Sequence, residues 1–450
     1  MYFRKLSSFI IVVINLITHD VALAEGGIGV QAEFIQRGEF LNGYGKPAGS
    51  NAEYAAFIGQ RARLKFNYQS ERLRFYVALQ DIRTWGSSTP NKLSDGFLSV
   101  HEAWTELSIG DRLKLKFGRQ ELNYDDGRFL GNADWALQAR AHDLAAFQYS
   151  KEGFALHGGF AFNQEKQNQL QGNFYSITGQ YKIAQYLWLN RSVNRLKFGF
   201  LFWNDGEQFL SIDNDSTRHE KVLYSQTLGL PILGYSVGAW NVSGFAYWQT
   251  GKTANDKALE AFDLGGEIVY QLKQERIGKE PRKFRFILGS EILSGNSQFS
   301  TKQHRSNAYN PLFGTNHKFN GYMDYFYVGG RHVNSVGLWD SYLKGVFEYS
   351  PSGFVGLSVH RFLAAEDVRN PQAGHMDEKM DRYLGMESDL TLGFIINDQF
   401  SLQGGCSIFL AEETMKALTG DIKASTSNYW AYIMMLIRPG NKVKFTGLRM

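Results

Sequence analysis

Polar and apolar residues alternate one by one along many segments of this chain. Residues 61–68, Arg-Ala-Arg-Leu-Lys-Phe-Asn-Tyr, show the pattern, and residues 72–77, 114–117, 197–202 and 284–286 repeat it. A period of two is typical of a β-strand whose two faces meet different surroundings. Helical periodicity is scarcely visible, so we expect an all-β fold.

The alternation predicts eighteen strands. They span residues 27–36, 57–69, 71–82, 98–109, 111–121, 142–150, 153–163, 173–184, 193–203, 219–229, 234–250, 262–272, 283–294, 334–350, 353–363, 385–397, 399–410 and 427–438. Pro231 separates the tenth strand from the eleventh.

The connections between these strands alternate between short and long. The short ones are at residues 70, 110–111, 151–152, 351–353 and 397–398. The long, polar ones are residues 37–56, 83–97, 122–141, 204–218, 295–333, 364–384 and 411–426. This pattern is typical of a single transmembrane antiparallel β-barrel with short periplasmic turns and long external loops. An even number of strands places both termini in the periplasm, and residues 412–418 are predicted to form a short helix.

A soluble β-sandwich would also alternate, but three features favour the membrane barrel. One face of the strands carries rows of Arg and Lys while the other carries Phe and Leu, which suits a wet lumen and a lipid surround. The strands reach the ~9–11 residues needed to cross a bilayer when tilted. Aromatic residues near strand ends are predicted to form interfacial girdles. They are Trp85, Trp104, Trp188, Trp203, Trp248, Trp430 and Tyr432.

The N-terminus has the features of a secretory signal peptide. Arg4 and Lys5 precede an apolar stretch at residues 9–17, and Ala22 and Ala24 form a small-x-small cleavage pattern. We therefore expect a signal peptide at residues 1–24, a barrel at 25–438 and a short periplasmic tail at 439–450. An uncleaved anchor is the alternative interpretation of the first segment.

Composition and missing motifs narrow the function classes. The 450 residues carry 48 basic and 44 acidic side chains, a net charge of +4, so no nucleic-acid partner is expected. The single cysteine, Cys406, excludes a disulfide scaffold. The ten histidines show no metal-ligand spacing, so we expect no metal, no cofactor and no enzyme activity. Two alternatives stay open: a calcium contact at residues 213–215 and a lipid hydrolase using Ser358 and His360.

Alternate residues of a strand share one face, and we call the face that a residue occupies its parity. If the apolar parity faces lipid, the rows of charged residues line the lumen. A charge on the lipid face would cost about 2–4 kcal/mol at the bilayer midplane. The predicted pore-lining residues are Arg61, Arg63, Lys65, Arg72, Arg74, Glu102, Glu106, Lys114, Lys116, Lys197, Glu267, Arg285 and Glu291. Rows of Arg and Lys lower the barrier for anions and raise it for cations, which predicts an anion-selective constriction. The alternative is that Arg–Glu networks only brace a polar lumen.

One stretch of the chain resembles the core motif of the alginate-export family of outer-membrane porins. It comprises residues 117–122, 126–131, Trp135, Gln138, Arg140 and Asp143, with residues 83–86 upstream. The loop at residues 311–321 resembles versions of this family seen in Bacteroidota. The resemblance covers essentially the whole mature chain and implies an 18-stranded barrel with an electropositive lumen in the outer membrane of a Gram-negative bacterium. It also implies transport of an anionic polymer or a smaller anionic solute.

The motif near residues 117–143 leads to a prediction about one loop. Arg119 breaks the parity of its strand, so we expect a bulge at Gly118 or a position above the membrane. The charged residues of the motif are predicted to form a salt-bridged pad that folds the third external loop over the lumen, or else only to fasten that loop. They are Arg119, Asp126, Arg128, Arg140 and Asp143.

The chain ends at Met450 rather than at the terminal aromatic residue that outer-membrane barrels usually present to the insertion machinery. Trp430 or Tyr432 is expected to serve in the girdle without that signal. The expected partners are outer-membrane lipid, the barrel-insertion machinery and an anionic small solute or polysaccharide. A barrel with a plugged lumen, acting as an adhesin or scaffold, is the alternative to a channel.

Overall fold

The computed structural model describes residues 26–91, 96–167, 169, 172–174, 180–276, 279–327, 335–372, 374 and 378–445. The predicted signal peptide and the last five residues of the predicted tail lie outside this part of the chain.

Eighteen long strands form one closed antiparallel barrel, as predicted. Each strand pairs with its neighbours in sequence, and β1 pairs with both β2 and β19, which closes the sheet. The strands of the first half are β1 (Gly27–Asn42), β2 (Ala55–Gln69), β3 (Leu73–Thr84), β4 (Leu98–Ile109), β5 (Leu113–Gln120), β6 (His142–Lys151), β7 (Phe154–Phe162), β8 (Ile183–Val193) and β9 (Leu196–Ile212). Those of the second half are β10 (Arg218–Val237), β11 (Trp240–Lys252), β12 (Ala258–Arg276), β13 (Lys279–Leu293), β15 (Leu338–Ser350), β16 (Gly353–Leu363), β17 (Tyr383–Asn397), β18 (Phe400–Ala411) and β19 (Ser427–Ile437).

In the described parts of the long connections there are three short elements. They are β14 (Arg305–Ser306), the 3₁₀ helix η2 (Asn316–Lys318) and the helix α2 (Glu413–Leu418). The helix confirms the prediction at residues 412–418. Among the described residues, no helix combines the length and the apolar character that crossing a membrane would require.

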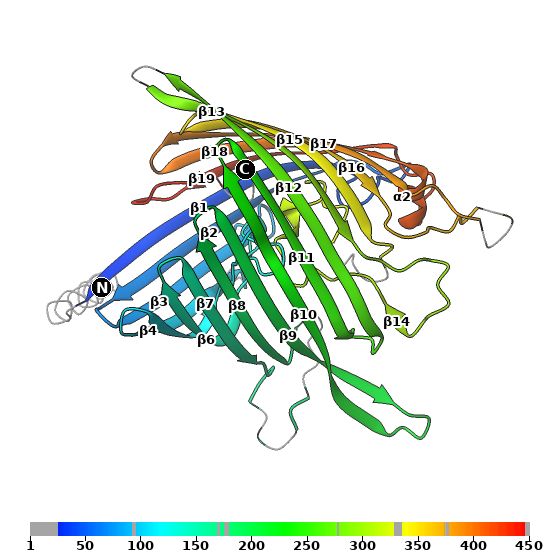
Figure 1. Cartoon of the computed structure of the whole chain (residues 1–450), viewed down its shortest axis with the longest axis horizontal. Coiled ribbons are helices and arrows are strands. Elements are labelled where there is room, and N and C mark those ends of the chain that lie inside the picture. The colour runs from blue at the N-terminus through cyan, green and yellow to red at the C-terminus, as the bar shows by residue number, and fades with distance from the viewer. Residues whose placement is uncertain are drawn as a thin grey trace.

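Short turns gather at one end of the barrel and long loops at the other. The N-terminal end of β1 and the β12–β13 hairpin lie at one end, and α2, β14 and the tip of the β9–β10 hairpin lie toward the other (Figure 1). The described turns at residues 70–72, 110–112, 152–153, 194–195, 238–239, 351–352 and 398–399 have two or three residues each. The arrangement agrees with periplasmic turns and external loops.

The strand predicted at residues 173–184 is wrong, because β8 runs from Ile183 to Val193. Residues 175–179 of the predicted span lie outside the described residues. Tyr186 and Trp188 point inward beside the outward Leu187, so both faces of β8 are apolar. Alternation between polar and apolar residues, the signal used for prediction, is therefore erased in this strand.

The predicted connections around β9 and β10 are also wrong. The loop expected at residues 204–218 shrinks to residues 213–217, since β9 and β10 continue as a hairpin beyond the barrel's main height. The break expected at Pro231 is a register irregularity inside β10, and the actual turn follows Val237. A bulge is one of the few places where a strand accepts proline.

The two faces of the sheet differ as the alternation predicts. Exposed apolar side chains such as Leu64, Phe75, Leu288 and Leu357 cover the outside of the barrel, where lipid would surround them. The inner face carries charged, polar and aromatic groups, and the buried core of the molecule lies inside the barrel.

Five of the seven aromatic residues assigned to interfacial girdles point inward instead, including the half-buried Trp188 of β8. Trp104, Trp203, Trp430 and Tyr432 are buried, and Trp430 is only 1% exposed. They occupy the inward parity of their strands. The rings of Trp203, Trp430 and Tyr432 pack against the inserted loops, whereas Trp104 stacks on Tyr76 of β3. Exposed aromatic positions include Trp85 and Trp248.

Candidate functional site: the barrel lumen

Two long loops of the described chain fold into the lumen, and we call them loop A and loop B. Loop A is the connection between β5 and β6, residues 121–141, and loop B is the described part of the connection between β13 and β15, within residues 294–337. Phe129, Trp135, Tyr309 and Met323 of these loops are buried within the barrel core. Whether loop B enters the barrel could not be predicted from the sequence.

Loop B crosses the lumen from one wall to the other. Its contacts with inward side chains are Asn310 with Gln249 of β11 (2.7 Å), Asn320 with Glu291 of β13 (2.9 Å), the Met323 N–H with Glu387 of β17 (2.8 Å) and Tyr325 stacked on Phe409 of β18 (4.0 Å). The Tyr325 hydroxyl then donates to the Gly43 carbonyl beyond β1 (2.6 Å).

Loops A and B hold each other by backbone hydrogen bonds. The Gly131 N–H donates to the Phe313 carbonyl (2.9 Å), and the Thr315 N–H donates to the Gly127 carbonyl (2.8 Å). Arg140 of loop A donates to the carbonyl oxygens of Phe313 and Gly314 in loop B. The two loops therefore form one constriction rather than two independent lids.

A cluster of aromatic residues packs loops A and B against β19. Trp135 of loop A stacks on His317 of loop B with ring centroids 4.4 Å apart. The same indole packs edge-on against Tyr432 (4.9 Å), and the Arg37 guanidinium lies 4.4 Å from its ring centre. This packing is why Trp430 and Tyr432 face inward.

Arg128 fastens the constriction to the opposite side. Its guanidinium forms an ion pair with Glu291 of β13, and it lies between the rings of Phe245 (4.0 Å) and Phe319 (3.9 Å). Both members of the ion pair are almost fully buried, and Asp126 lies 3.5 Å from the same arginine.

The salt-bridged pad predicted for the loop motif does not form as one unit. Arg119 and Asp143 pair with each other at 2.8 Å, but both are exposed, on the outward parity of β5 and β6. Arg140 bonds to carbonyl oxygens rather than to a carboxylate. The β4–β5 register also runs through Gly118 without a shift, so the predicted bulge there is wrong.

Gly118 has another role. Its φ angle is +115°, a region that favours glycine, and a side chain there would meet the Ala103 carbonyl of the neighbouring strand.

The inward basic residues of β2 include Arg61 and Arg63, and Arg61 holds loop A in place. Arg61 is fully buried and donates to Glu33 (2.7 Å) and to the Leu137 carbonyl of loop A (3.0 Å), with Asp134 of loop A at 2.9 Å. Arg63 beside it donates to Gln80 of β3 (2.7 Å).

The basic residues nearer the turn end are more open. Lys65 lies 3.7 Å from Glu33, and the exposed Lys114 pairs with Glu106 (2.9 Å). Lys116 and Arg74 lie 3.9 Å and 5.1 Å from the ring centre of Trp104, whose indole N–H donates to Glu102. Arg72 lies in the β2–β3 turn rather than on a strand, because β3 begins only at Leu73.

The far side of the lumen contains a cavity of about 350 Å³ with both polar and apolar lining residues. Asp125 and Asp126 of loop A and Glu267 of β12 line it, and the exposed Lys197 of β9 completes its charged lining. The Tyr342 hydroxyl donates to Glu267 (2.5 Å). Arg285, another of the predicted pore-lining residues, pairs with Glu348 (3.0 Å).

Asp125 is a lumen residue that sequence reasoning missed, because strand parity does not extend into a loop. Its carboxylate accepts a hydrogen bond from the Trp188 indole N–H (2.8 Å). Burial raises the pKa of Asp125 to about 6, and the neighbouring charge of Asp126 acts in the same direction.

The sequence left two alternatives open, a lipid hydrolase using Ser358 and His360 and a calcium contact at residues 213–215. Ser358 donates to Asp389 (3.0 Å) and His360 contacts Asp340 (2.9 Å), so each is bound to a different carboxylate inside the barrel. At residues 213–215, Asp213 contacts His219 (2.7 Å) on the β9–β10 hairpin. Elsewhere in the described residues, His101, Glu102 and Glu121 form a group that could hold a metal ion.

A closed antiparallel barrel with an apolar exterior, a polar lumen and inward-folded loops defines an outer-membrane porin-like protein. A family model described as alginate export matches residues 51–429. The chain therefore belongs to the alginate-export family, as the resemblance implied.

Solved porins share the fold. OccK9 (OpdG) of Pseudomonas aeruginosa is 13% identical over 91% of this chain and 98% of its own, with a TM-score of 0.54. OccK2 (OpdF) of the same organism, in complex with glucuronate, is 12% identical over 92% and 98%, also at 0.54. OccK11 (OpdR) is 11% identical over 91% and 95%, at 0.53. No curated protein matches the chain.

Proposed function

We propose that this barrel is a channel for anionic solutes, with anionic saccharides among its cargo. The observation that carries the proposal is the basic wall formed by neighbouring strands β2, β3 and β5. Lys65, Arg74, Lys114 and Lys116 belong to this wall, and Arg and Lys rows favour anions in a pore. Arg74 and Lys116 also flank an indole ring, and guanidinium groups bind carboxylates well.

The family and the fold support this proposal, since both are those of porin-type channels rather than enzymes. The similar barrel of OccK2 has been solved with glucuronate, a carboxylated sugar. A polysaccharide built of such sugars is a longer cargo of the same kind. Its passage requires an open path through the lumen past loops A and B.

The competing proposal is a plugged barrel that acts as an adhesin or scaffold. Loop B spans the lumen between opposite walls, which is the specific observation in its favour. Planar-bilayer conductance of the refolded protein separates the two proposals. A steady open conductance supports the channel, and a barrel that inserts without conducting supports the scaffold.

Ion selectivity tests the role of the basic wall. A unit charge ~8 Å away in water contributes about 0.5 kcal/mol, so a charge reversal changes the anion barrier by about 1 kcal/mol. The cation barrier falls by the same amount. We therefore expect Arg74→Glu and Lys114→Glu each to lower the anion-to-cation permeability ratio about thirtyfold at low salt. Arg63 is a poor choice, because it is buried near loop A.

Arg119→Glu is the matched control, since Arg119 is exposed on the outer face of the barrel. Its permeability ratio should stay at the wild-type value. Unchanged selectivity in both Arg74→Glu and Lys114→Glu would refute the role assigned to the wall.

A further inference from the structure

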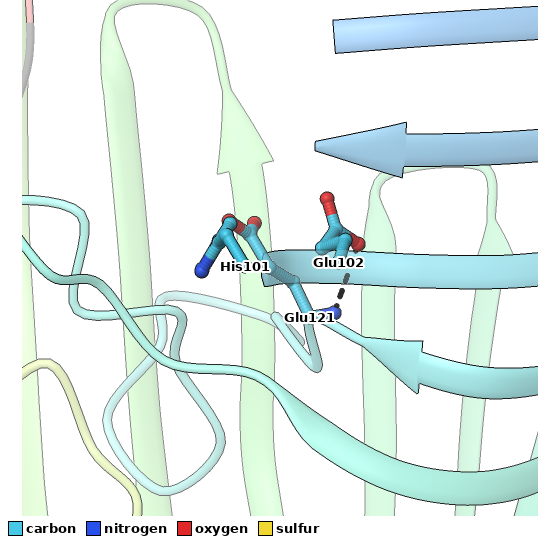
Figure 2. A group of neighbouring side chains, drawn as sticks. All are labelled: His101, Glu102 and Glu121. Atoms are coloured by element: carbon cyan, nitrogen blue, oxygen red, sulfur yellow. Dashed lines mark hydrogen bonds and ion pairs between the residues drawn. The ribbon is translucent and has the colours of Figure 1, made fainter. Parts of the chain in front are cut away.

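Three side chains meet at the root of loop A. His101 and Glu102 belong to β4, and Glu121 is the first residue after β5. The His101 Nε2 atom lies 2.7 Å from a Glu121 carboxylate oxygen, and one ligand atom from each residue lies within 4.8 Å of the others. Figure 2 shows the three side chains converging from the two strands.

A strand bulge is the reason that two consecutive residues take part. The β3–β4 register shifts so that Ala78 pairs with Glu102 while Leu79 pairs with Val100, which leaves His101 as the extra residue. In a regular strand His101 and Glu102 would point to opposite faces. Bulges re-aim side chains in this way and often lie next to functional sites.

Neighbouring groups hold both carboxylates in place. Asn132 of loop A donates to one Glu121 oxygen (2.8 Å), while the Glu121 backbone N–H and the Trp104 indole N–H donate to Glu102 (3.1 and 3.0 Å). His101 itself is only 3% exposed. Hydrogen bonds that orient ligands in this way are typical of the surroundings of protein metal sites.

We propose that His101, Glu102 and Glu121 bind a divalent transition-metal ion of the Zn²⁺ type, which ties loop A to the barrel wall. An imidazole nitrogen and carboxylate oxygens are ordinary Zn²⁺ ligands, at about 2.0–2.2 Å from the ion. The widest separation in the group is at most 4.8 Å, so it contracts by no more than about 1.5 Å when the ion enters. Water completes the coordination.

The charge of the group suits a cation. Two of its three members, Glu102 and Glu121, are carboxylates, and the guanidinium of Arg63 interacts electrostatically with Glu121. The arginine also competes with the ion, so the site should bind less tightly than a fully anionic one.

Metal binding to the refolded full-length chain tests the proposal. After removal of metals with EDTA, Zn²⁺ is titrated by calorimetry, and Co²⁺ absorption serves as a spectroscopic probe of the ligands. We expect one equivalent of Zn²⁺ to bind per chain. His101→Ala and Glu121→Gln should abolish this binding, and Asn132→Ala should weaken it about tenfold.

The matched control is His219→Ala. His219 forms another histidine–carboxylate contact, with Asp213 at 2.7 Å, but on the exposed β9–β10 hairpin. This variant should bind Zn²⁺ as the wild type does. Each variant is first shown to be folded by its heat-dependent shift in electrophoretic mobility, and Glu102→Gln provides a conservative variant in case His101→Ala fails to fold.

A second readout concerns loop A itself. Bound Zn²⁺ should slow proteolytic cleavage within residues 121–141 in the wild type, but not in Glu121→Gln. The proposal is overturned if the wild type binds no Zn²⁺, or if stoichiometric binding persists in both Glu121→Gln and Glu102→Gln.

Discussion

Replacing Arg128 with alanine should release the constriction from the β13 wall. Arg128 pairs with Glu291 inside the barrel, and both side chains are at most 4% exposed. The substitution leaves the buried Glu291 without a cationic partner, beside the Asn320 amide of loop B and the carboxyl group of Asp263 on β12. It also removes the guanidinium from between Phe245 and Phe319.

The expected effect is large because the ion pair is buried. Breaking a buried pair by removing one partner destabilises a protein by about 3–5 kcal/mol, and a factor of ten in an equilibrium corresponds to about 1.4 kcal/mol. The fraction of molecules with loops A and B undocked from this wall should therefore rise about 10²- to 4 × 10³-fold.

Single-channel recording measures this change, since undocked loops produce excursions to a higher conductance. Arg119→Ala is the matched control: it removes an exposed ion pair of the same sequence motif, which should be worth less than about 1 kcal/mol. Combining Arg128→Ala with Glu291→Gln should cost less than the sum of the single substitutions, since neither buried charge remains. Wild-type currents in Arg128→Ala, or strict additivity in the double variant, would refute the reasoning.

Two further predictions concern the same loops. Burial raises the pKa of Asp125 to about 6, so the folded loop favours the protonated carboxyl group. Protonation of Asp125 therefore stabilises the folded loop by at most about 3 kcal/mol. This stabilisation is complete below the ordinary pKa of 3.8 and is lost as the pH rises through 6. Proteolysis of loop A should therefore be faster at pH 7 than at pH 5, and Asp125→Asn should remove the difference; the same pH dependence in that variant would contradict the assignment. Gly321→Ala should destabilise the barrel by about 1–3 kcal/mol in denaturant unfolding, because its φ angle is +82° and the added carbon would lie 2.5 Å from the Glu387 carboxylate. Gly420→Ala, at a φ of +79° with open space around it, is the control for backbone strain alone, and an equal effect there would show that Glu387 plays no part.

Strand parity explains how much of the fold could be predicted. Alternation is a local property, and in β2 it directly assigns Arg61 and Arg63 to one face and Leu64 to the other. The same rule failed in β8, where Tyr186 and Trp188 place apolar groups on the inner face as well. Parity thus predicts a strand only where the two surfaces differ in polarity.

Parity also failed to distinguish the two uses of an aromatic ring near a strand end. Trp430 and Trp248 look alike in the sequence, but Trp430 is buried beside loop A and Trp248 is exposed. The difference depends on which parity each occupies and on where loops A and B fold. Those loops carry no regular pattern from which a path could be inferred.

The sequence by itself determined the closed barrel, the number of its strands, the gathering of the long loops at one end and the family. These features follow from periodicity, connection length and motif, each of which acts over a few residues. Only the tertiary structure decided that Arg128 meets Glu291 across 163 positions of sequence, that Arg119 stays outside, and that His101 meets Glu121. Arg119 stays outside because β5 continues through Gly118 without a bulge. The other two contacts depend on where the inserted loops run, and that path is set by packing against several strands at once.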